Sequence, residues 1–485
     1  MIRNYLNQYK KTPLTVRAAL AYTICSILQR SLSIIAVILF TRMLTTEEYG
    51  QVSVYGSWQG IMTVFITLQV PYGTFSTAML KYEDRRNQYT SCAQFFCVMM
   101  GGIAVAVITI FRTCFSQVFE LPYFIIVFMI AEIVANAIIL CWFARERFEY
   151  KYRSVVTFTV VQSMIGLLLM FLFVICSKER GYAKIVGNSL NSIIFGSIVL
   201  AFSFYIGKKI FVWEFLKYII KFNLPLLPYY LSQIIFNSSD RIMISNLKST
   251  SDAGIYSIAF SLGMLMNFIL TAVLNAYQPW FFYRIKDGTA AQHKKNTTWI
   301  ALGMAILVIG LITATPEIIG IMAGEKYRGA IWAVPPIAIS LYVQYCTNIF
   351  LYLDFYHEIK VYMNIATISA AVINVILNWI FIPYVGFVGA AYTTLVSYIV
   401  FEIISFISYK KICKQYEYKE DVFEIKKLFL IQLVVMMLGL VLMLLYKSFT
   451  IRLMLIVAGI LVVYFCRKTI IDVFKKIKTS GSNVL

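Results

Sequence analysis

Long apolar segments recur along the whole chain, separated by short polar stretches. A helix of about 20 apolar residues crosses the roughly 30 Å hydrocarbon core of a bilayer. The pattern therefore predicts an all-α polytopic membrane protein with about 14 transmembrane helices. These spans are expected at 18–41, 50–72, 91–111, 121–142, 154–175, 182–206, 223–247, 254–279, 298–323, 331–353, 361–383, 386–409, 428–446 and 450–467.

Composition supports this interpretation. Of the 485 residues, 60% are hydrophobic and 14% are charged, with a mean hydropathy of +0.76, whereas soluble domains carry about 25% charged residues. Every predicted loop is short, which leaves no room for a soluble catalytic domain. The nine cysteines show no metal or redox spacing and are expected to be small core residues.

The distribution of basic residues predicts an orientation. Roughly three-quarters of the 43 Lys and Arg residues fall in the loops that share one side with the N-terminus, and such loops are usually cytoplasmic. Both termini are therefore expected in the cytoplasm, and a thirteen-span arrangement with the basic tail outside is rejected. The net charge of +20 then reflects membrane topology and does not indicate nucleic-acid binding.

Two neighbouring spans, 223–247 and 254–279, each carry a stripe of polar side chains on one helix face. Polar and charged groups at bilayer depth are retained where protein or water surrounds them, so the stripes indicate the wall of a wet cavity. The alternative is that Asp240 and Arg241 neutralise each other and only join helices. The stripes consist of Gln233, Asn237, Asp240 and Arg241, and of Asn267, Thr271, Asn275 and Gln278.

The two halves of the chain resemble each other. Aligning Ser53 with Ser257 places Thr63 on Asn267 and Thr67 on a second threonine, so the polar stripes of spans 2 and 8 coincide. This indicates a parallel repeat of six plus six helices. The expected organisation is an N-terminal lobe at 1–207, an interfacial amphipathic linker at 208–221, a C-terminal lobe at 222–409, a cytoplasmic connector at 410–427, and spans 13 and 14 with a cytoplasmic tail at 428–485.

Further polar positions complete the predicted cavity. Arg30 and Glu132 are both expected near the middle of the bilayer, where Arg30 either binds an anionic substrate or pairs with Glu132. Enzyme signals are weak: there is no Walker A pattern, and the two histidines converge with no other catalytic group. No cofactor or metal is expected. The remaining candidates for the cavity are Gln59, Thr63, Thr67, Asn136, Asn374 and Asn378.

Three motifs in order resemble the polysaccharide-biosynthesis flippases, and the resemblance covers nearly the whole chain. They are TRMLTTEEYGQVSVY, FNLPLLPYYLSQIIFNSSDRIMISNLKSTSDAGIYSIAF and IPYVGFVGAAYTTLVSY. The resemblance implies the fold of the multidrug/oligosaccharidyl-lipid/polysaccharide exporter superfamily, with two pseudo-symmetric six-helix lobes around a cavity that opens alternately to each side. It also implies that cationic residues, here Arg30 and Arg241, hold the diphosphate of an undecaprenyl-linked oligosaccharide for O-antigen or capsule.

The resemblance implies a bacterial plasma membrane location. Expected partners are the lipid-linked oligosaccharide, membrane lipids, and polysaccharide polymerase and chain-length proteins. Coupling to an H+ or Na+ gradient is left open. A rival is an ion-coupled multidrug exporter of the same fold, with Glu132 and Asp240 as coupling sites. A membrane polymerase or acyltransferase is disfavoured because no catalytic groups converge on an external loop.

Overall fold

The computed structural model describes residues 13–359, 361–418, 421–455, 457 and 459. Within these ranges every regular element is a helix, which confirms the predicted fold class. The chain divides into two compact units, Met1–Ser238 and Ser239–Leu485, and each is described by itself. The predicted domain boundaries stay a prediction.

The first unit is built around α7 (Tyr123–Phe148), which packs against α3, α4, α5 and α9. A Cβ placed on Gly196 of α9 would lie 2.7 Å from the Cβ of Ala135 on α7, so these two helices approach closely through small residues. The unit comprises α2 (Leu14–Met43), α3 (Thr46–Thr67), α4 (Phe75–Lys81), η1 (Glu83–Arg85), α5 (Arg86–Ile110), α6 (Arg112–Phe119), α7, α8 (Tyr152–Cys176), α9 (Arg180–Gly207), α10 (Trp213–Asn223), η2 (Leu224–Leu226) and the start of α11 (Leu227–Leu247).

The start of α3 follows directly from its sequence. Thr45 accepts a hydrogen bond from the backbone N–H of Glu48, and the Glu48 carboxylate accepts one from the backbone N–H of Thr45. This capping box satisfies two amides that the helix itself leaves without partners. At its other end α3 stops at Leu68, whose backbone is left-handed with φ 46°. The chain therefore turns sharply before α4.

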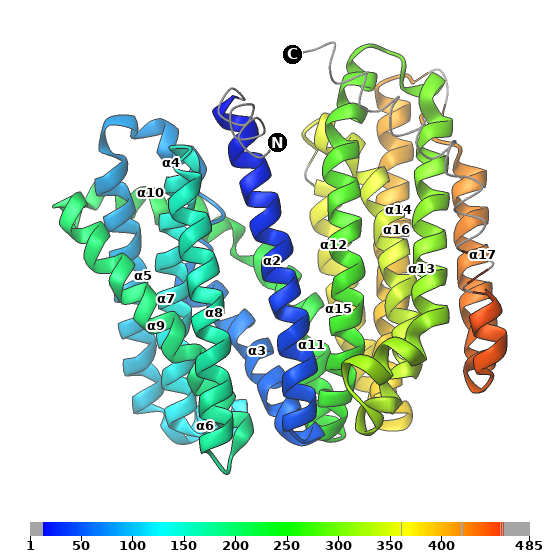
Figure 1. Ribbon diagram of the computed structural model, residues 1–485. Coiled ribbons are helices and arrows are strands. Elements are labelled where there is room, and N and C mark those ends of the chain that lie inside the picture. Colours follow the sequence, from blue (N-terminus) through cyan, green and yellow to red (C-terminus); the bar gives the residue numbers. More distant parts are fainter. Residues whose placement is uncertain (1–12, 360, 419–420, 456, 458, 460–485) are drawn as a thin grey trace, which may run out of the picture. The chain divides into compact units, whose positions relative to one another are not determined.

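The second unit is built around α14 (Val334–Tyr356), most of whose side chains are buried. It packs against α12, α13, α16 and α17, which run beside it in Figure 1. The unit comprises the end of α11, α12 (Thr250–Lys286), η3 (Ala290–His293), α13 (Lys294–Met322), η4 (Glu325–Trp332), α14, α15 (Val361–Val385), α16 (Phe387–Gln415), α17 (Ile425–Leu444) and η5 (Leu445–Lys447).

Eleven helices of the described chain are long and apolar enough to cross a membrane. They correspond to predicted spans 1, 3–6 and 8–13. Predicted spans 2 and 7 form α3 and α11, which are helical but more polar. Most of predicted span 14 and the tail lie outside the described residues, so the number fourteen stays a prediction.

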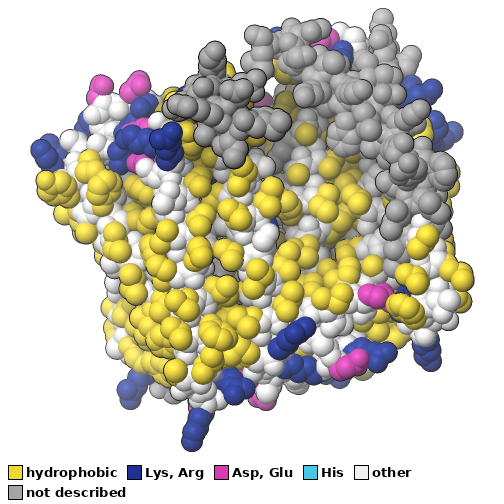
Figure 2. All heavy atoms as spheres, in the orientation of Figure 1, with side chains coloured by type: hydrophobic (Ala, Val, Ile, Leu, Met, Phe, Trp, Pro, Cys, Tyr) yellow, Lys and Arg dark blue, Asp and Glu magenta, His cyan; other side chains and the backbone are white. Residues whose placement is uncertain are grey.

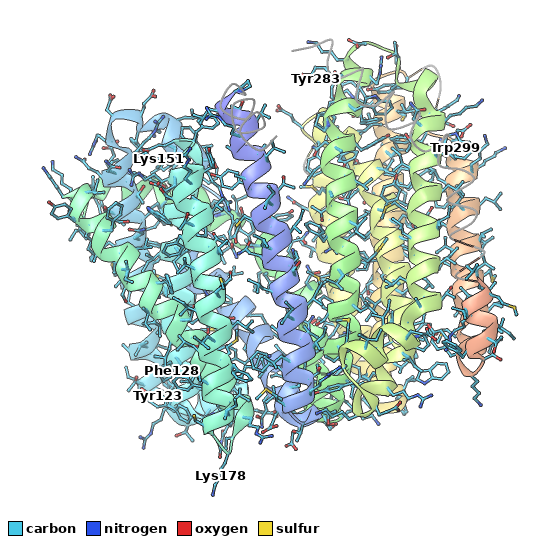
Figure 3. All side chains as sticks on the ribbon, viewed as in Figure 1. Tyr123, Phe128, Lys151, Lys178, Tyr283 and Trp299 are labelled. Carbon is cyan, nitrogen blue, oxygen red and sulfur yellow. The ribbon has the colours of Figure 1, made fainter. Side chains whose placement is uncertain are left out.

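Charged side chains gather toward the helix ends, while hydrophobic side chains cover the middle of the surface in Figure 2. Figure 3 shows Lys151 and Lys178 near opposite ends of α8. This distribution is the one that a bilayer requires, because the helix middles face hydrocarbon and the ends face water.

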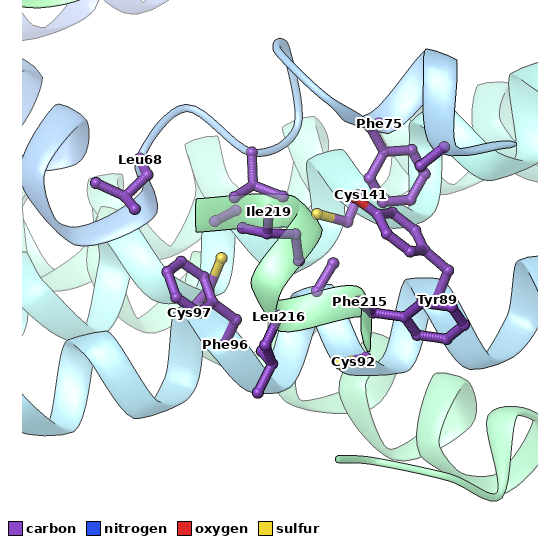
Figure 4. Close-up of a cluster of buried hydrophobic side chains, with 14 of the residues drawn as sticks. Leu68, Phe75, Tyr89, Cys92, Phe96, Cys97, Cys141, Phe215, Leu216 and Ile219 are labelled. Carbon is purple, nitrogen blue, oxygen red and sulfur yellow. The ribbon is translucent and has the colours of Figure 1, made fainter. Parts of the chain in front are cut away.

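The linker helix α10 (Trp213–Asn223) buries its apolar face within the first unit. The helix begins at Trp213, whereas the predicted segment began at residue 208. Phe215, Leu216 and Ile219 are buried in a cluster with Tyr89 of α5 (Figure 4). The apolar face of α10 therefore packs into its own lobe, while the Trp213 side chain is exposed.

Candidate functional site

A polar groove runs along α3 and α7 in the first unit. It consists of two adjoining cavities, of about 200 and 560 Å³, which share Pro71, Tyr72 and Leu140. We call the cavity beside the middle of α7 the inner cavity and the one beside the C-terminal end of α7 the outer cavity. Besides the shared residues, the inner cavity is lined by Gly56, Gln59, Gly60, Thr63, Thr67, Ile133, Asn136 and Ala137. The outer cavity adds Ser76, Ala144, Arg147, Phe148 and Tyr150.

The α3 wall of the groove carries the predicted stripe Gln59, Thr63 and Thr67. The Thr63 hydroxyl donates to the Gln59 carbonyl at 2.7 Å, and the Thr67 hydroxyl donates to the Thr63 carbonyl at 2.8 Å. Each threonine is thereby satisfied as a donor. The Thr63 oxygen keeps acceptor capacity, whereas the Thr67 oxygen already accepts a hydrogen bond from the Gln69 backbone N–H at 3.1 Å. Three polar groups spaced one turn apart therefore form one continuous wall.

The α7 wall carries Asn136 at the inner end and Arg147 at the outer end. Both line the groove, so the structure brings Asn136 together with the α3 stripe. The Arg147 guanidinium carbon lies 5.6 Å from the ring centre of Tyr22 and 5.8 Å from that of Phe143. Cation–π contacts of this length hold a guanidinium in place and leave its N–H groups able to donate.

Glu132, one turn before Asn136, points elsewhere and is 2% exposed. Its carboxylate accepts hydrogen bonds from the Tyr55 hydroxyl, the Ser189 hydroxyl and the Asn188 amide, each at 2.7 Å. The three donors come from α3 and α9 and are all neutral. They satisfy a carboxylate that would otherwise be very costly to bury.

Asp240 has a comparable environment in the second unit and is also 2% exposed. It accepts hydrogen bonds from the Tyr256 hydroxyl at 2.6 Å, the Asn378 amide at 2.7 Å and the Thr394 hydroxyl at 3.0 Å. Asn374 extends this network to Thr394 and Asn378. The structure thus brings the predicted residues Asp240, Asn374 and Asn378 together.

These two networks have defined chemical possibilities. Carboxylate, amide and hydroxyl oxygens are the ligands of hard cations. No group of three His, Cys, Asp or Glu residues that could hold a metal ion occurs among the described residues. Any ion at Glu132 or Asp240 would therefore rely on neutral oxygens as well.

The remaining predicted residues are more scattered. Arg30 is exposed on α2, and the Arg241 guanidinium carbon lies 4.0 Å from the ring centre of Phe260. These two arginines belong to different units. Gln233 and Asn237 are linked along α11 by a hydrogen bond from the Asn237 amide to the Gln233 carbonyl. On α12, Asn267 is half-buried, whereas Thr271 and Asn275 are exposed.

Sequence reasoning missed two kinds of residue. The partners of the buried carboxylates lie on other helices, so the periodicity of a single helix does not reveal them. In the sequence, Arg147 falls between predicted spans 4 and 5, in a basic loop that indicates only the orientation of the chain in the membrane. Its eleven-residue separation from Asn136 on the same helix could have placed both near one face. The missed residues are Tyr55, Arg147, Asn188, Ser189, Tyr256 and Thr394.

Comparisons with solved structures identify the fold. The lipid II flippase MurJ in an inward closed conformation superposes with a TM-score of 0.68 at 15% identity, covering 93% of this chain and 99% of that one. An inward-facing multidrug resistance MATE family transporter superposes with a TM-score of 0.62 at 16% identity, covering 82% and 99%. A transporter of the same superfamily from Pyrococcus furiosus gives 0.54 at 14% identity, covering 83% and 96%. The protein therefore has the fold of the multidrug/oligosaccharidyl-lipid/polysaccharide exporter superfamily.

Residues 15–284 match the family described as polysaccharide biosynthesis protein. This match covers more than half of the chain, so the chain belongs to that family, and the family that the sequence resembles is confirmed. The matched residues include the first two motifs and end before the third. A comparison with curated protein sequences gives no match.

Proposed function

We propose that this protein is a flippase that moves a polyprenyl-diphosphate-linked oligosaccharide, such as an O-antigen or capsule repeat unit, across the bacterial plasma membrane by alternating access. The observation that carries the proposal is the groove of the first unit, which combines neutral amides and hydroxyls with a guanidinium at one end. It occurs in a chain that belongs to a polysaccharide biosynthesis family.

The groove suits a sugar better than an apolar drug. Gln59, Thr63 and Asn136 offer amide and hydroxyl groups that can replace the water around sugar hydroxyls, because hydrogen bonds to neutral groups compensate for lost hydration. Ile133 and Leu140 line the same cavity and offer contact to the apolar faces of sugar rings. The polyprenyl chain would stay in the lipid, where its burial costs nothing.

Arginine supplies the complementary recognition of the diphosphate. A guanidinium presents a planar fork of donors that matches two phosphate oxygens. Arg30 and Arg241 are the candidates that the family resemblance implies. They would bind the diphosphate while the substrate passes from one side of the membrane to the other. Polysaccharide polymerase and chain-length proteins would receive the product.

A reconstitution experiment tests this function. Vesicles containing the purified protein and a fluorescent undecaprenyl-diphosphate trisaccharide are treated with an enzyme that modifies only outward-facing sugar. Flipping should expose the whole lipid pool, whereas protein-free vesicles should expose about half of it. Exposure no faster than in protein-free vesicles would reject the flippase function.

The second candidate is an ion-coupled multidrug exporter of the same fold. The observation that favours it is the pair of buried carboxylates, Glu132 and Asp240, each held by three neutral donors. In the same vesicles this function predicts uptake of a fluorescent organic cation under an H+ or Na+ gradient. The flippase function predicts no such uptake. If an H+ or Na+ gradient drives lipid transfer, substituting either carboxylate should make the rate of lipid transfer independent of the gradient.

A further inference from the structure

We infer that Arg147 binds the diphosphate of the substrate and that the groove from Arg147 to Asn136 holds its sugars in line. This inference rests on the proposed function. It differs from the expectation that Arg30 and Arg241 alone hold the diphosphate, because Arg147 lies in neither predicted stripe.

The first argument is the charge balance at the end of α7. Arg145 is buried and lies 3.6 Å from the Glu146 carboxylate and 3.4 Å from that of Glu149. Lys151 lies 2.6 Å from Glu149. In the part of the chain that the structure describes, Arg147 has no ion pair, and it is exposed. Among these three neighbouring basic residues, Arg147 is therefore the one whose charge is available to an anionic ligand.

The second argument is placement. Arg147 is a lining residue of the outer cavity, beside Ser76 and Tyr150, whose hydroxyls can also donate to phosphate oxygens. The aromatic rings of Tyr22 and Phe143 fix the position of the guanidinium. A positioned cation with neighbouring hydroxyl donors is the arrangement expected for a phosphate group.

The third argument is length. Eleven residues separate Asn136 from Arg147 on α7, and at a rise of 1.5 Å per residue this is about 16 Å. Both cavities lie along that distance and are joined through Tyr72 and Leu140. The groove is therefore too long for a single sugar on a diphosphate. It has room for several rings that follow one another from the phosphate end to the amide end.

The two ends of the groove differ chemically, and this difference sets the direction in which the substrate lies. Arg147 lies at the outer end and the neutral amides of Gln59 and Asn136 lie at the inner end. Among the described residues neither amide side chain is held by another side chain, so both can bind a sugar. The diphosphate therefore lies nearest the end of α7, and the sugars extend from it toward the two amides.

Binding to the full-length protein in detergent tests this arrangement. The probes are a short-chain polyprenyl diphosphate without sugar, the same diphosphate carrying a trisaccharide, and phosphatidylglycerol as a lipid with a single phosphate. Arg147→Ala should weaken both diphosphate probes at least tenfold, and Arg147→Lys should recover part of the loss because it keeps the charge but not the fork. Arg153→Ala removes a positive charge from the first turn of the next helix, α8, outside the groove, and serves as the matched control.

Asn136→Ala separates the two ends of the groove. It should weaken the trisaccharide probe several-fold and leave the sugar-free diphosphate unchanged. The inference is overturned if Arg147→Ala binds both diphosphates as tightly as the unmodified protein. It is also overturned if phosphatidylglycerol competes as well as the sugar-free diphosphate, since the site would then be a general lipid contact.

The failure of this inference and the failure of the proposed function give different results. If the unmodified protein flips the lipid-linked trisaccharide in vesicles and Arg147→Ala flips it equally fast, the function stands and the Arg147 site is rejected. If the unmodified protein does not flip that lipid, the proposed function is rejected and the inference with it.

Discussion

Glu132 and Asp240 show how single residues keep charge inside a membrane lobe. Each carboxylate receives three hydrogen bonds from neutral side chains, and a tyrosine from the second predicted span of its half contributes one of them. Their burial could be predicted from their place in apolar segments. Their partners could not be predicted, because hydrogen bonds between helices depend on which faces meet.

The Asp240 network predicts a stability effect of one hydroxyl. Tyr256→Phe removes a donor from a carboxylate that stays buried, and leaving such a group short of a partner costs about 1–3 kcal/mol. The melting temperature in detergent should therefore fall clearly. Tyr345→Phe is the matched control, because Tyr345 is equally buried and its hydroxyl has no partner among the described residues. Equal melting temperatures for Tyr256→Phe and the unmodified protein would show that this hydrogen bond contributes nothing.

The two intramembrane arginines give a prediction about transport. If Arg30 and Arg241 bind diphosphate during transfer, Arg→Ala at either position should abolish export while the protein still inserts. Arg→Lys should restore only part of the activity. The measurement is complementation of glycan export alongside protein abundance in membranes. Normal export by the double Arg→Ala variant at normal abundance would disprove this role.

The alternative role of Arg30 as a structural partner of Glu132 is distinguished by abundance. Removing one member of a buried ion pair leaves an uncompensated charge and is strongly destabilising. Arg30→Ala would then lower protein abundance, and adding Glu132→Gln would rescue it. Since Glu132 already has three neutral donors, we expect abundance to be maintained in Arg30→Ala.

At the scale of helices, sequence signals are strong where they are local. The capping box at Thr45 and Glu48 and the apolar periods of the long helices are readable from the sequence, and the structure contains both. The packing partners of α10 could not be predicted in the same way. Its pattern shows an apolar face but not what covers that face, and in the structure the cover is Tyr82 and Tyr89 of its own lobe.

The packing of α10 predicts the effect of truncating its buried face. Phe215 is fully buried, with its ring centre 4.7 Å from that of Tyr82, and Phe→Ala in such a site costs about 3–5 kcal/mol. Phe215→Ala should lower the melting temperature and the yield of the protein. Trp213→Ala is the control on the same helix, because Trp213 is 67% exposed and its removal should change neither. Equal effects of both variants would indicate that α10 is held mainly through its exposed face.

A pH effect is expected where the connector after α16 meets the end of α14. The ring of His357 is stacked on Tyr416 with 3.6 Å between centres, and its Nε2 lies 3.0 Å from the Tyr418 hydroxyl. Burial lowers the pKa of His357 below its ordinary value of 6.5. The unfolded chain therefore binds a proton at this histidine more readily than the folded chain. As the pH falls through 6.5, the folded state should lose stability.

Melting temperatures measured from pH 7.5 to 5.5 test this effect. His357→Phe keeps an aromatic ring for stacking but cannot be protonated, so its melting temperature should depend less on pH over this range. Carboxylates with ordinary pKa values titrate mostly below it. An identical pH dependence in the variant and the unmodified protein would show that His357 does not contribute.

For the whole molecule, the sequence predicted the class of fold because membrane insertion imposes length, hydropathy and charge rules on every span. The sequence showed polar stripes in spans 2, 7 and 8. Two of these spans, α3 and α11, are too polar to count among the eleven apolar spans of the described chain, whereas α12 counts among them. What could not be predicted is which stripe residues share a cavity. Gln59 and Asn136 meet across α3 and α7, whereas other stripe residues are separated between the two units.

The orientation of the whole chain gives the last prediction. The basic residues lie mainly in loops on the side of the N-terminus, and the energetic preference for keeping such loops in the cytoplasm sets the topology. Reporter fusions after Lys209, between α9 and α10, and at Leu485 should therefore both report a cytoplasmic location. A fusion after Lys178, between α8 and α9, is the matched control and should report the opposite side. A cytoplasmic Lys209 with an external Leu485 would mean an odd number of spans after α9 and would rule out the fourteen-span arrangement, while an external Lys209 would reverse the orientation of the first unit.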